Sequence, residues 1–111
     1  MASFQTILIP APDVAASRDL YRALLGVEPS VDGPYYVGFD VQGQHVGLIP
    51  NGSAVRPHLH VEAIAQAVQT VLAAGGSVVE EPKDVGGGRL VAVVRDGGGA
   101  EIGLIEDAAR G

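Results

Sequence analysis

The sequence predicts an α+β fold in which two modules each run strand, helix, strand, strand, strand. One observation behind this prediction is a turn followed by an apolar, glycine-containing segment, residues 40–49, which recurs 56 positions later. The other is a helical spacing of apolar residues in 13–25, which recurs in 64–74. A unit that occurs twice in a short chain indicates an internal duplication. We therefore expect a single domain, residues 1–111, made of module one at 1–50, a junction at 51–54 and module two at 55–107.

The repeated segment has the chemistry of a β-hairpin. In each copy an acidic residue and a glycine bracket a tight turn, because a carboxylate bonds nearby backbone amides and glycine adopts positive φ. The matching pairs are Asp40 and Asp96, Gly43 and Gly99, Val46 and Ile102, Gly47 and Gly103, Leu48 and Leu104, and Ile49 and Ile105.

The elements of the first half follow from local signals. Asp13 is expected to cap the first helix, and Gly26 is expected to end it. The predicted elements are a strand at 4–11, a helix at 13–25, a weak strand at 28–31, hairpin strands at 35–39 and 44–49, and a junction at 50–53.

The second half repeats this order. Two consecutive glycines, Gly75 and Gly76, are expected to end its helix, and the tail from Asp107 is expected to fray. The predicted elements are a strand at 58–61, a helix at 64–74, a strand at 77–81 and a hairpin at 90–106.

The composition narrows the class of protein. Apolar residues are 47% of the chain and charged residues 18%, which is typical of a folded domain. The net charge of −6 and the scattered basic residues argue against a nucleic-acid partner. No apolar run approaches the roughly 20 residues of a membrane span, and no signal-like segment is present. With no cysteine as well, we expect a cytoplasmic protein without a membrane partner.

Several short motifs occur in a specific order and spacing. They are Ile7-Leu8-Ile9-Pro10-Ala11-Pro12-Asp13, Leu20-Tyr21, Leu25-Gly26, Ala74-Gly75-Gly76, Glu81-Pro82, Asp84-Val85-Gly86, Arg95-Asp96-Gly97-Gly98-Gly99 and Ile102-Gly103-Leu104. Together they make nearly the whole chain resemble the vicinal oxygen chelate superfamily, the glyoxalase, bleomycin-resistance and extradiol-dioxygenase group. The resemblance implies paired βαβββ modules forming a curved mixed sheet around a cavity, binding or chemistry inside that cavity, and a homodimer.

The resemblance also implies a divalent metal with one ligand near the start of each module and one on each module's last strand. Enzymes of the family use His, Gln or Glu there and leave open positions for substrate oxygens. The corresponding residues of this sequence are Thr6, Gly47, Arg56 and Gly103. None of these is an ordinary ligand, so the sequence predicts that the usual metal site is absent.

Other polar residues share the strand faces of these positions, because side chains two apart point to the same side of a sheet. The predicted ligand-binding residues are His45, Arg56, His58, His60 and Glu101. If His45, His58, His60 and Glu101 converge, they would be a sufficient set for a displaced zinc or non-haem iron site. Histidines on strand faces are also commonly hydrogen-bonding residues without a ligand.

Three functional hypotheses remain open. The first is a metal-free small-molecule binding protein, similar to the drug-sequestering members of the family. Its weakness is that few aromatic residues, chiefly Tyr35, Tyr36 and Phe39, are available to stack on a ligand. The second is a metal-dependent lyase, isomerase or dioxygenase that uses the displaced site. The third is an accessory dimer whose cavity is vestigial.

Overall fold

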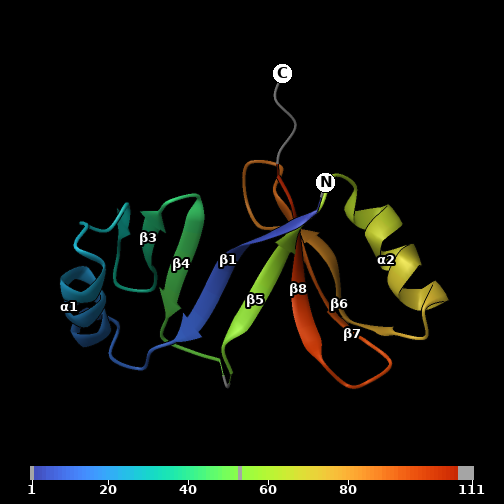
Figure 1. Ribbon diagram of the computed structural model, residues 1–111, viewed down its shortest axis with the longest axis horizontal. Coiled ribbons are helices and arrows are strands. Elements are labelled where there is room, and N and C mark those ends of the chain that lie inside the picture. The colour runs from blue at the N-terminus through green and yellow to red at the C-terminus, as the bar shows by residue number, and fades with distance from the viewer. Residues whose placement is uncertain (1, 53, 108–111) are drawn as a thin grey trace. The chain divides into compact units, whose positions relative to one another are not determined.

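The computed structural model describes residues 2–52 and 54–107, whose elements are shown in Figure 1. Ser53 of the predicted junction and residues 108–111 of the predicted frayed tail lie outside this range. The elements are β1 (Ser3–Pro10), α1 (Val14–Leu25), β2 (Val31–Asp32), β3 (Val37–Val41), β4 (Gln44–Ile49), β5 (Arg56–His60), α2 (Ile64–Ala73), β6 (Ser77–Asp84), β7 (Leu90–Arg95) and β8 (Glu101–Glu106).

The chain divides into two compact units with the same topology. The first unit contains residues 5–56, and the second contains residues 2–4 and 57–107 of the described chain. Strand order is β2-β3-β4-β1 in the first unit and β6-β7-β8-β5 in the second. In each, the first strand runs parallel to the last, and the last three strands are antiparallel. The α+β fold class with two βαβββ modules is therefore confirmed.

The two hairpins differ at their turns, which corrects one expectation. Asp96 bonds the turn as predicted, since its Oδ1 accepts from the amides of Gly98 at 2.8 Å and Ala100 at 2.9 Å. Asp40 was expected to do the same, and this is wrong. The first hairpin turns within two residues, Gln42 at φ 49° and Gly43 at φ 81°, so it needs no side-chain acceptor. The Asp40 carboxylate is therefore able to bond a side chain of the neighbouring strand β4.

Some strand boundaries also differ from the prediction. The weak strand expected at 28–31 is limited to β2, because Pro29 has no N–H with which to extend the ladder. The first hairpin strand begins at Val37 rather than Tyr35. Strand β6 continues to Asp84, past the predicted end, through two irregularities in its register with β7.

Each unit has its own apolar core between its helix and one face of its sheet. Phe39 and Leu48 have no exposed surface in the first unit, and Ile64 and Leu104 are each 2% exposed in the second. Phe39 was a candidate for stacking on a ligand, and this expectation is wrong because its ring lies in the core. The buried core residues are Ala11, Val14, Val37, Phe39 and Leu48 in the first unit, and Ile64, Val68, Ala92, Val94 and Leu104 in the second.

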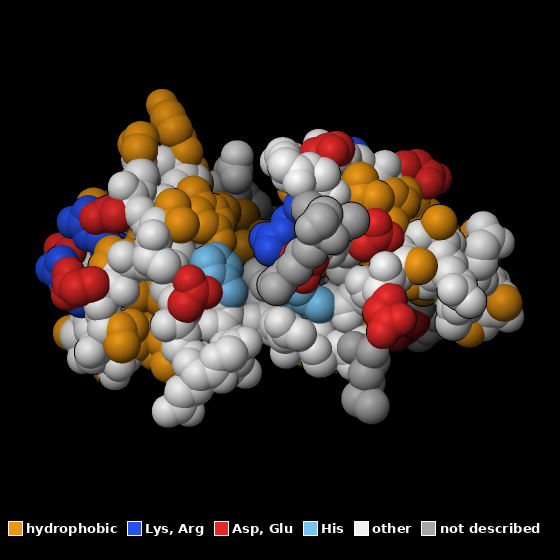
Figure 2. Space-filling view, turned by 90° about the horizontal axis from the view of Figure 1, so that it is seen from above, with side chains coloured by type: hydrophobic (Ala, Val, Ile, Leu, Met, Phe, Trp, Pro, Cys, Tyr) orange, Lys and Arg blue, Asp and Glu red, His pale blue; other side chains and the backbone are white. Residues whose placement is uncertain are grey.

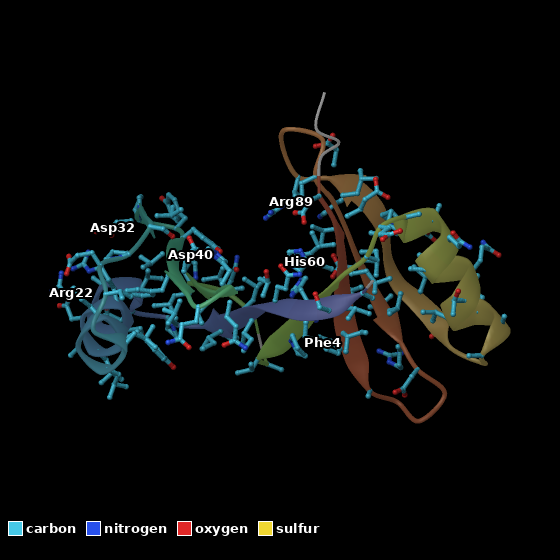
Figure 3. All side chains as sticks on the ribbon, turned by 45° about the horizontal axis from the view of Figure 1, so that its top comes forward. Phe4, Arg22, Asp32, Asp40, His60 and Arg89 are labelled. Atoms are coloured by element: carbon cyan, nitrogen blue, oxygen red, sulfur yellow. The ribbon has the colours of Figure 1, made fainter. Side chains whose placement is uncertain are left out.

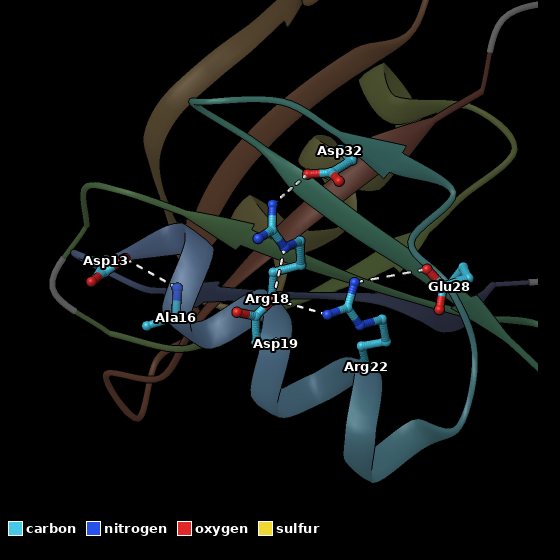
Figure 4. Close-up of polar contacts among 7 residues, drawn as sticks. All are labelled: Asp13, Ala16, Arg18, Asp19, Arg22, Glu28 and Asp32. Carbon is cyan, nitrogen blue, oxygen red and sulfur yellow. Dashed lines mark hydrogen bonds and ion pairs between the residues drawn. The ribbon is translucent and has the colours of Figure 1, made fainter.

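Helix α1 is capped as the sequence predicted (Figure 4). The Asp13 carboxylate accepts a hydrogen bond from the Ala16 amide at 3.1 Å, and Gly26 ends the helix with a left-handed φ of 71°. Further along the helix, Arg18 and Arg22 form exposed ion pairs with nearby carboxylates, including Arg18 with Asp32 at 3.2 Å. Such exposed pairs contribute little to stability, because water and salt screen the charges.

Helix α2 is capped by a residue that is distant in sequence. Its N-cap residue, Ala63, has no side-chain acceptor, and the Glu106 carboxylate at the end of β8 accepts from the Ile64 amide at 2.8 Å. We expect Glu106→Ala to lower the free energy of unfolding by about 0.5–2 kcal/mol, the usual loss for a missing cap. Urea unfolding would measure it. Glu106→Gln keeps an acceptor oxygen and should lose less; equal losses in the two variants would contradict the capping role.

Candidate functional site

The predicted site residues lie on the sheet faces that point away from the helices. In the first unit, Leu48 faces the α1 core, so His45, three positions earlier on β4, faces the other side. In the second unit, Leu59 and its partner Leu104 belong to the α2 core. His58, with its partner Gly103, therefore occupies the opposite face. His60 and Glu101 share that face by the same alternation.

His45 is held between a carboxylate and a phenol. Its Nδ1 lies 2.8 Å from Asp40 Oδ1, and its Nε2 is hydrogen-bonded to the Tyr36 hydroxyl. Asp40 and His45 are cross-strand partners in the β3–β4 register, which fixes the first contact. The Tyr36 and His45 rings are nearly parallel, 8° apart. Figure 2 shows histidine atoms beside acidic atoms at the molecular surface, and the His45 side chain is 25% exposed.

The pKa of Asp40 is lowered. A hydrogen bond from Ser30 contributes most, and the hydrogen bond with His45 adds to it. Asp40 is therefore ionised at neutral pH and can only accept hydrogen bonds, so the His45 Nδ1 must carry a proton.

Glycines make room for these rings. A Cβ built on Gly38 would lie 2.6 Å from His45 Cε1, and one on Gly47 would lie 2.5 Å from the Tyr36 hydroxyl oxygen and 2.6 Å from Leu8 Cδ2. Both glycines belong to the β3–β4 hairpin and are paired with each other. A larger residue at either position would displace the rings, so these glycines are required by packing.

His58 fills the corresponding place in the second unit. It is 3% exposed, and its ring lies where a Cβ on Gly103 would stand. The positions where the resemblance implies last-strand metal ligands, Gly47 and Gly103, are thus occupied by neighbouring side chains. The implied metal does not fit these residues. Among residues 2–52 and 54–107, no three His, Cys, Asp or Glu side chains are grouped so that they could hold a metal ion.

His60 belongs to a different polar cluster of the second unit. Its Nδ1 lies 3.1 Å from Asp107 Oδ2, and the other carboxylate oxygen of Asp107 accepts from Arg89 at 2.8 Å. Figure 3 labels His60 and Arg89, whose side chains lie near each other. The His60 side chain is mostly buried, and those of Asp107 and Arg89 are about half exposed. Asp107 was expected to be the first residue of a frayed tail. It is instead held by His60, the last residue of β5, and by Arg89, which immediately precedes β7.

This cluster makes a pH-dependent contribution to stability. Burial opposes ionisation of Asp107, but hydrogen bonds from His60 and Arg89 outweigh it and lower its pKa below the usual 3.8. The stabilisation is therefore complete above the pKa of the unfolded chain and is lost as pH falls through the folded value. We expect Asp107→Asn to cost up to about 1 kcal/mol near pH 7 and nothing in strong acid. Urea unfolding across pH 2–7 would measure this; equal stabilities at pH 7 would contradict it.

The remaining predicted residues have separate positions. The Glu101 carboxylate accepts from Arg95 at 2.6 Å across the β7–β8 pair, the place that Asp40 and His45 occupy in the first hairpin. Arg56 is the first residue of β5 and is partly buried. The structure thus gives His45, His60 and Glu101 individual carboxylate or arginine partners and does not gather His58, His60 and Glu101 into a three-ligand set within the described chain.

Sequence reasoning missed the partners of these residues. Tyr36 was considered only as a stacking surface, and Asp40 only as a turn residue. The signal that could have found the Asp40–His45 pair is the spacing across a two-residue turn, which sets them opposite each other.

The sequence also did not predict an open hollow of about 670 Å³ in the first unit. It lies beside Asp13, Arg18 and Pro34, and none of the predicted ligand-binding residues lines it.

Comparison with known proteins gives a family. A family model described as the Glyoxalase/Bleomycin resistance protein/Dioxygenase superfamily matches residues 3–104. This range contains all of the described helices and nearly all of the strands. No curated protein matches the chain significantly.

Several solved structures have a similar fold at low sequence identity. A hypothetical protein from Bacillus halodurans C-125 is 14% identical, with a TM-score of 0.80 over 99% of this chain and 97% of that one. A variant of Streptomyces coelicolor methylmalonyl-CoA epimerase in complex with 2-nitronate-propionyl-CoA is 18% identical, with a TM-score of 0.71 over 96% and 95%. A superfamily member from Vibrio splendidus 12B01 is 20% identical, with a TM-score of 0.71 over 96% and 100%. Similarity at this level concerns the fold.

Proposed function

Because the chain belongs to the glyoxalase/bleomycin resistance protein/dioxygenase superfamily, we propose that it binds a small molecule without a metal at the usual ligand positions of that family. The observation that carries this proposal is glycine at positions 47 and 103, with Tyr36, Leu8 and His58 filling the space beside them. A carboxylate or imidazole at either position would collide with those side chains. Without such ligands, the polar groups of the same faces act on the small molecule directly.

The proposed ligand-binding residues are those of the helix-free sheet faces. Carboxylate, phenol or arginine partners hold several of these groups in fixed orientations, which suits recognition by hydrogen bonding. The net charge of −6 disfavours an anionic ligand, so we expect a neutral or cationic one. The proposed set is His45, Arg56, His58, His60 and Glu101.

A metal titration tests the metal-free part of this proposal. Elemental analysis of tag-free protein, and calorimetry with Zn²⁺, Mn²⁺ and Fe²⁺, should give no stoichiometric ion per chain. The matched variant is His58→Ala combined with His60→Ala, which should behave like the wild type in the same titration. One tightly held ion per wild-type chain that is lost in this variant would overturn the proposal and favour a metal-dependent lyase, isomerase or dioxygenase.

A ligand screen tests the binding part. Cationic and aromatic natural products would be added in a thermal-shift assay, where a ligand at 100 times its Kd stabilises by about 2.7 kcal/mol. The compounds that bind the wild type should bind His45→Ala more weakly and stabilise it less. A screen without any saturable ligand, together with no metal, would contradict the proposal and favour an accessory dimer with a vestigial cavity.

We also propose that the protein is a cytoplasmic homodimer without nucleic-acid or membrane partners. Exposed apolar side chains on α1, Leu20 and Leu24, support association because water-exposed apolar surface is stabilised by a partner. Neither of the two helices in the described chain has the length and apolar character needed to cross a membrane. Sedimentation across micromolar concentrations would test the dimer, and a monomer throughout would refute it.

A further inference from the structure

We propose that the second unit has a separate binding site for a small amphiphilic amine, in an apolar hollow between the C-terminus of α2 and the β7–β8 turn. The hollow has a volume of about 230 Å³. The two segments that enclose it lie at the same end of the second unit in Figure 1. This inference goes beyond the proposed function, because none of the residues proposed above to bind a ligand lines this hollow.

Apolar side chains form the walls of the hollow. Val71 of α2, Val94 of β7 and Ile102 of β8 line it, and all three belong to the apolar core of the second unit or pack against it. Space remains because Gly76 and Gly97, which also line it, have no side chain. The volume is below the roughly 300–1,000 Å³ of sites for drug-sized molecules, so it suits one ring with a short chain.

The polar side chains of the hollow offer acceptors to a ligand. The Thr70 hydroxyl donates its proton to the Gln66 carbonyl at 3.1 Å, which leaves its oxygen as an acceptor. Asp96 Oδ1 accepts from two amides of its own turn, and no group within residues 2–52 and 54–107 bonds its Oδ2. A carboxylate only accepts hydrogen bonds, so the ligand group that binds Asp96 is a donor.

The electrostatics of the hollow favour a cationic donor. Within the described chain, Asp96 is the one charged residue that lines it. The C-terminus of α2 adds the partial negative charge of the helix dipole, and its last turn has no basic residue, whereas α1 has Arg22 there. Arg95, which precedes Asp96, is bonded to Glu101 at 2.6 Å on the opposite face of the sheet. A cation from outside the chain therefore complements this end of the unit.

A primary amine on a small apolar body meets these conditions together. The body packs against the valine and isoleucine walls and is removed from water, and the ammonium group donates to the Asp96 carboxylate. An alcohol of the same shape lacks the charge. A carboxylate ligand would be repelled by Asp96 and by the helix C-terminus.

An NMR titration of the whole chain with benzylamine locates the binding. We expect saturable shifts of the amide signals of Val71, Gly76, Gly97 and Ile102. Benzyl alcohol, the matched neutral probe, should bind at the same place about twofold or more weakly, because it lacks the ion pair. Phenylacetate should give no saturable shifts there. Shifts centred instead on the opposite face of the sheet, around His58, would overturn the site.

Asp96→Asn tests the charge, because it keeps the Oδ1 acceptor that bonds the turn and removes the ionised group. It should weaken benzylamine binding about twofold to fivefold and leave benzyl alcohol binding unchanged. Asp84→Asn is the matched control: Asp84 also accepts from an amide of its own turn, that of Gly86 at 2.7 Å, but does not line the hollow. This control should bind benzylamine like the wild type. Equal loss in the two variants, or no loss in Asp96→Asn, would overturn the inference. Circular dichroism would establish that each variant is folded.

The variant used in the ligand screen separates this inference from the proposed function. His45 belongs to the first unit, so His45→Ala should bind benzylamine like the wild type. Loss of benzylamine binding in His45→Ala would assign the amine to the residues of the proposed function and would overturn the separate site. Absence of saturable shifts up to the solubility limit of benzylamine would overturn the inference alone, since the ligand screen decides the proposed function independently.

Discussion

Phe39→Ala is expected to lower the free energy of unfolding by about 3–5 kcal/mol, because the ring has no exposed surface and its loss leaves a cavity in the first core. Domains of this size have a total stability of about 5–15 kcal/mol, so one substitution removes a large share of it. Urea unfolding would measure the loss. A loss below about 1 kcal/mol would mean that the core collapses around the missing ring.

The matched substitution in the second core, Leu104→Ala, tests whether the two units unfold together. Leu104 is 2% exposed, and its truncation should cost about 2–5 kcal/mol. All three tyrosines lie in residues 5–56, so tyrosine fluorescence reports the first unit alone. If the chain unfolds as the single domain that we predict, Leu104→Ala lowers the urea midpoint measured by tyrosine fluorescence, as Phe39→Ala does. A fluorescence midpoint unchanged by Leu104→Ala would mean that the units unfold separately.

Local sequence signals account for most of the fold. The hairpin at 90–106, the Asp13 cap and the Gly26 stop depend on residues that are close in the chain, so their chemistry is visible without a structure. The duplication then extends the interpretation from one half to the other, because the same topology recurs in both. The alternation of side chains along each strand also correctly indicated that the predicted site residues point away from the helix-facing cores.

The sequence could not predict which side chains become hydrogen-bond partners when they are distant in the chain. His60 contacts Asp107, 47 positions away, and Glu106 caps a helix that begins 42 positions earlier. Neither pairing has a local signature, because each depends on which strand ends meet. Asp40 is instructive because two copies of one motif diverge: its turn closes without help, whereas the longer turn after Asp96 uses the carboxylate. The longer turn thus uses its aspartate as a structural group, whereas the two-residue turn leaves Asp40 to pair with His45.

Gly103→Ala is expected to lower the free energy of unfolding by about 1–3 kcal/mol, the usual cost of overpacking. Without a clash, a glycine-to-alanine substitution would instead stabilise the protein by about 0.4–1 kcal/mol, because it reduces the conformational entropy of the unfolded chain. The new Cβ would overlap the ring of the buried His58. Gly97→Ala is the matched control, because the nearest atom to its Cβ is 3.5 Å away. Its stability should change by no more than about 0.5 kcal/mol.

A double-mutant cycle shows whether the ring is the cause. His58→Ala removes the ring, so Gly103→Ala should cost less in that background, and the two losses should fall short of additivity by about 1 kcal/mol or more. Simple additivity would contradict the overlap. The cycle also bears on function, because a glutamate at position 103, where the family usually has a metal ligand, needs the same space. If His58 must be removed before even a methyl group fits, then Gly103 is required by packing, and the histidine ring occupies the space that a side chain at this position would need.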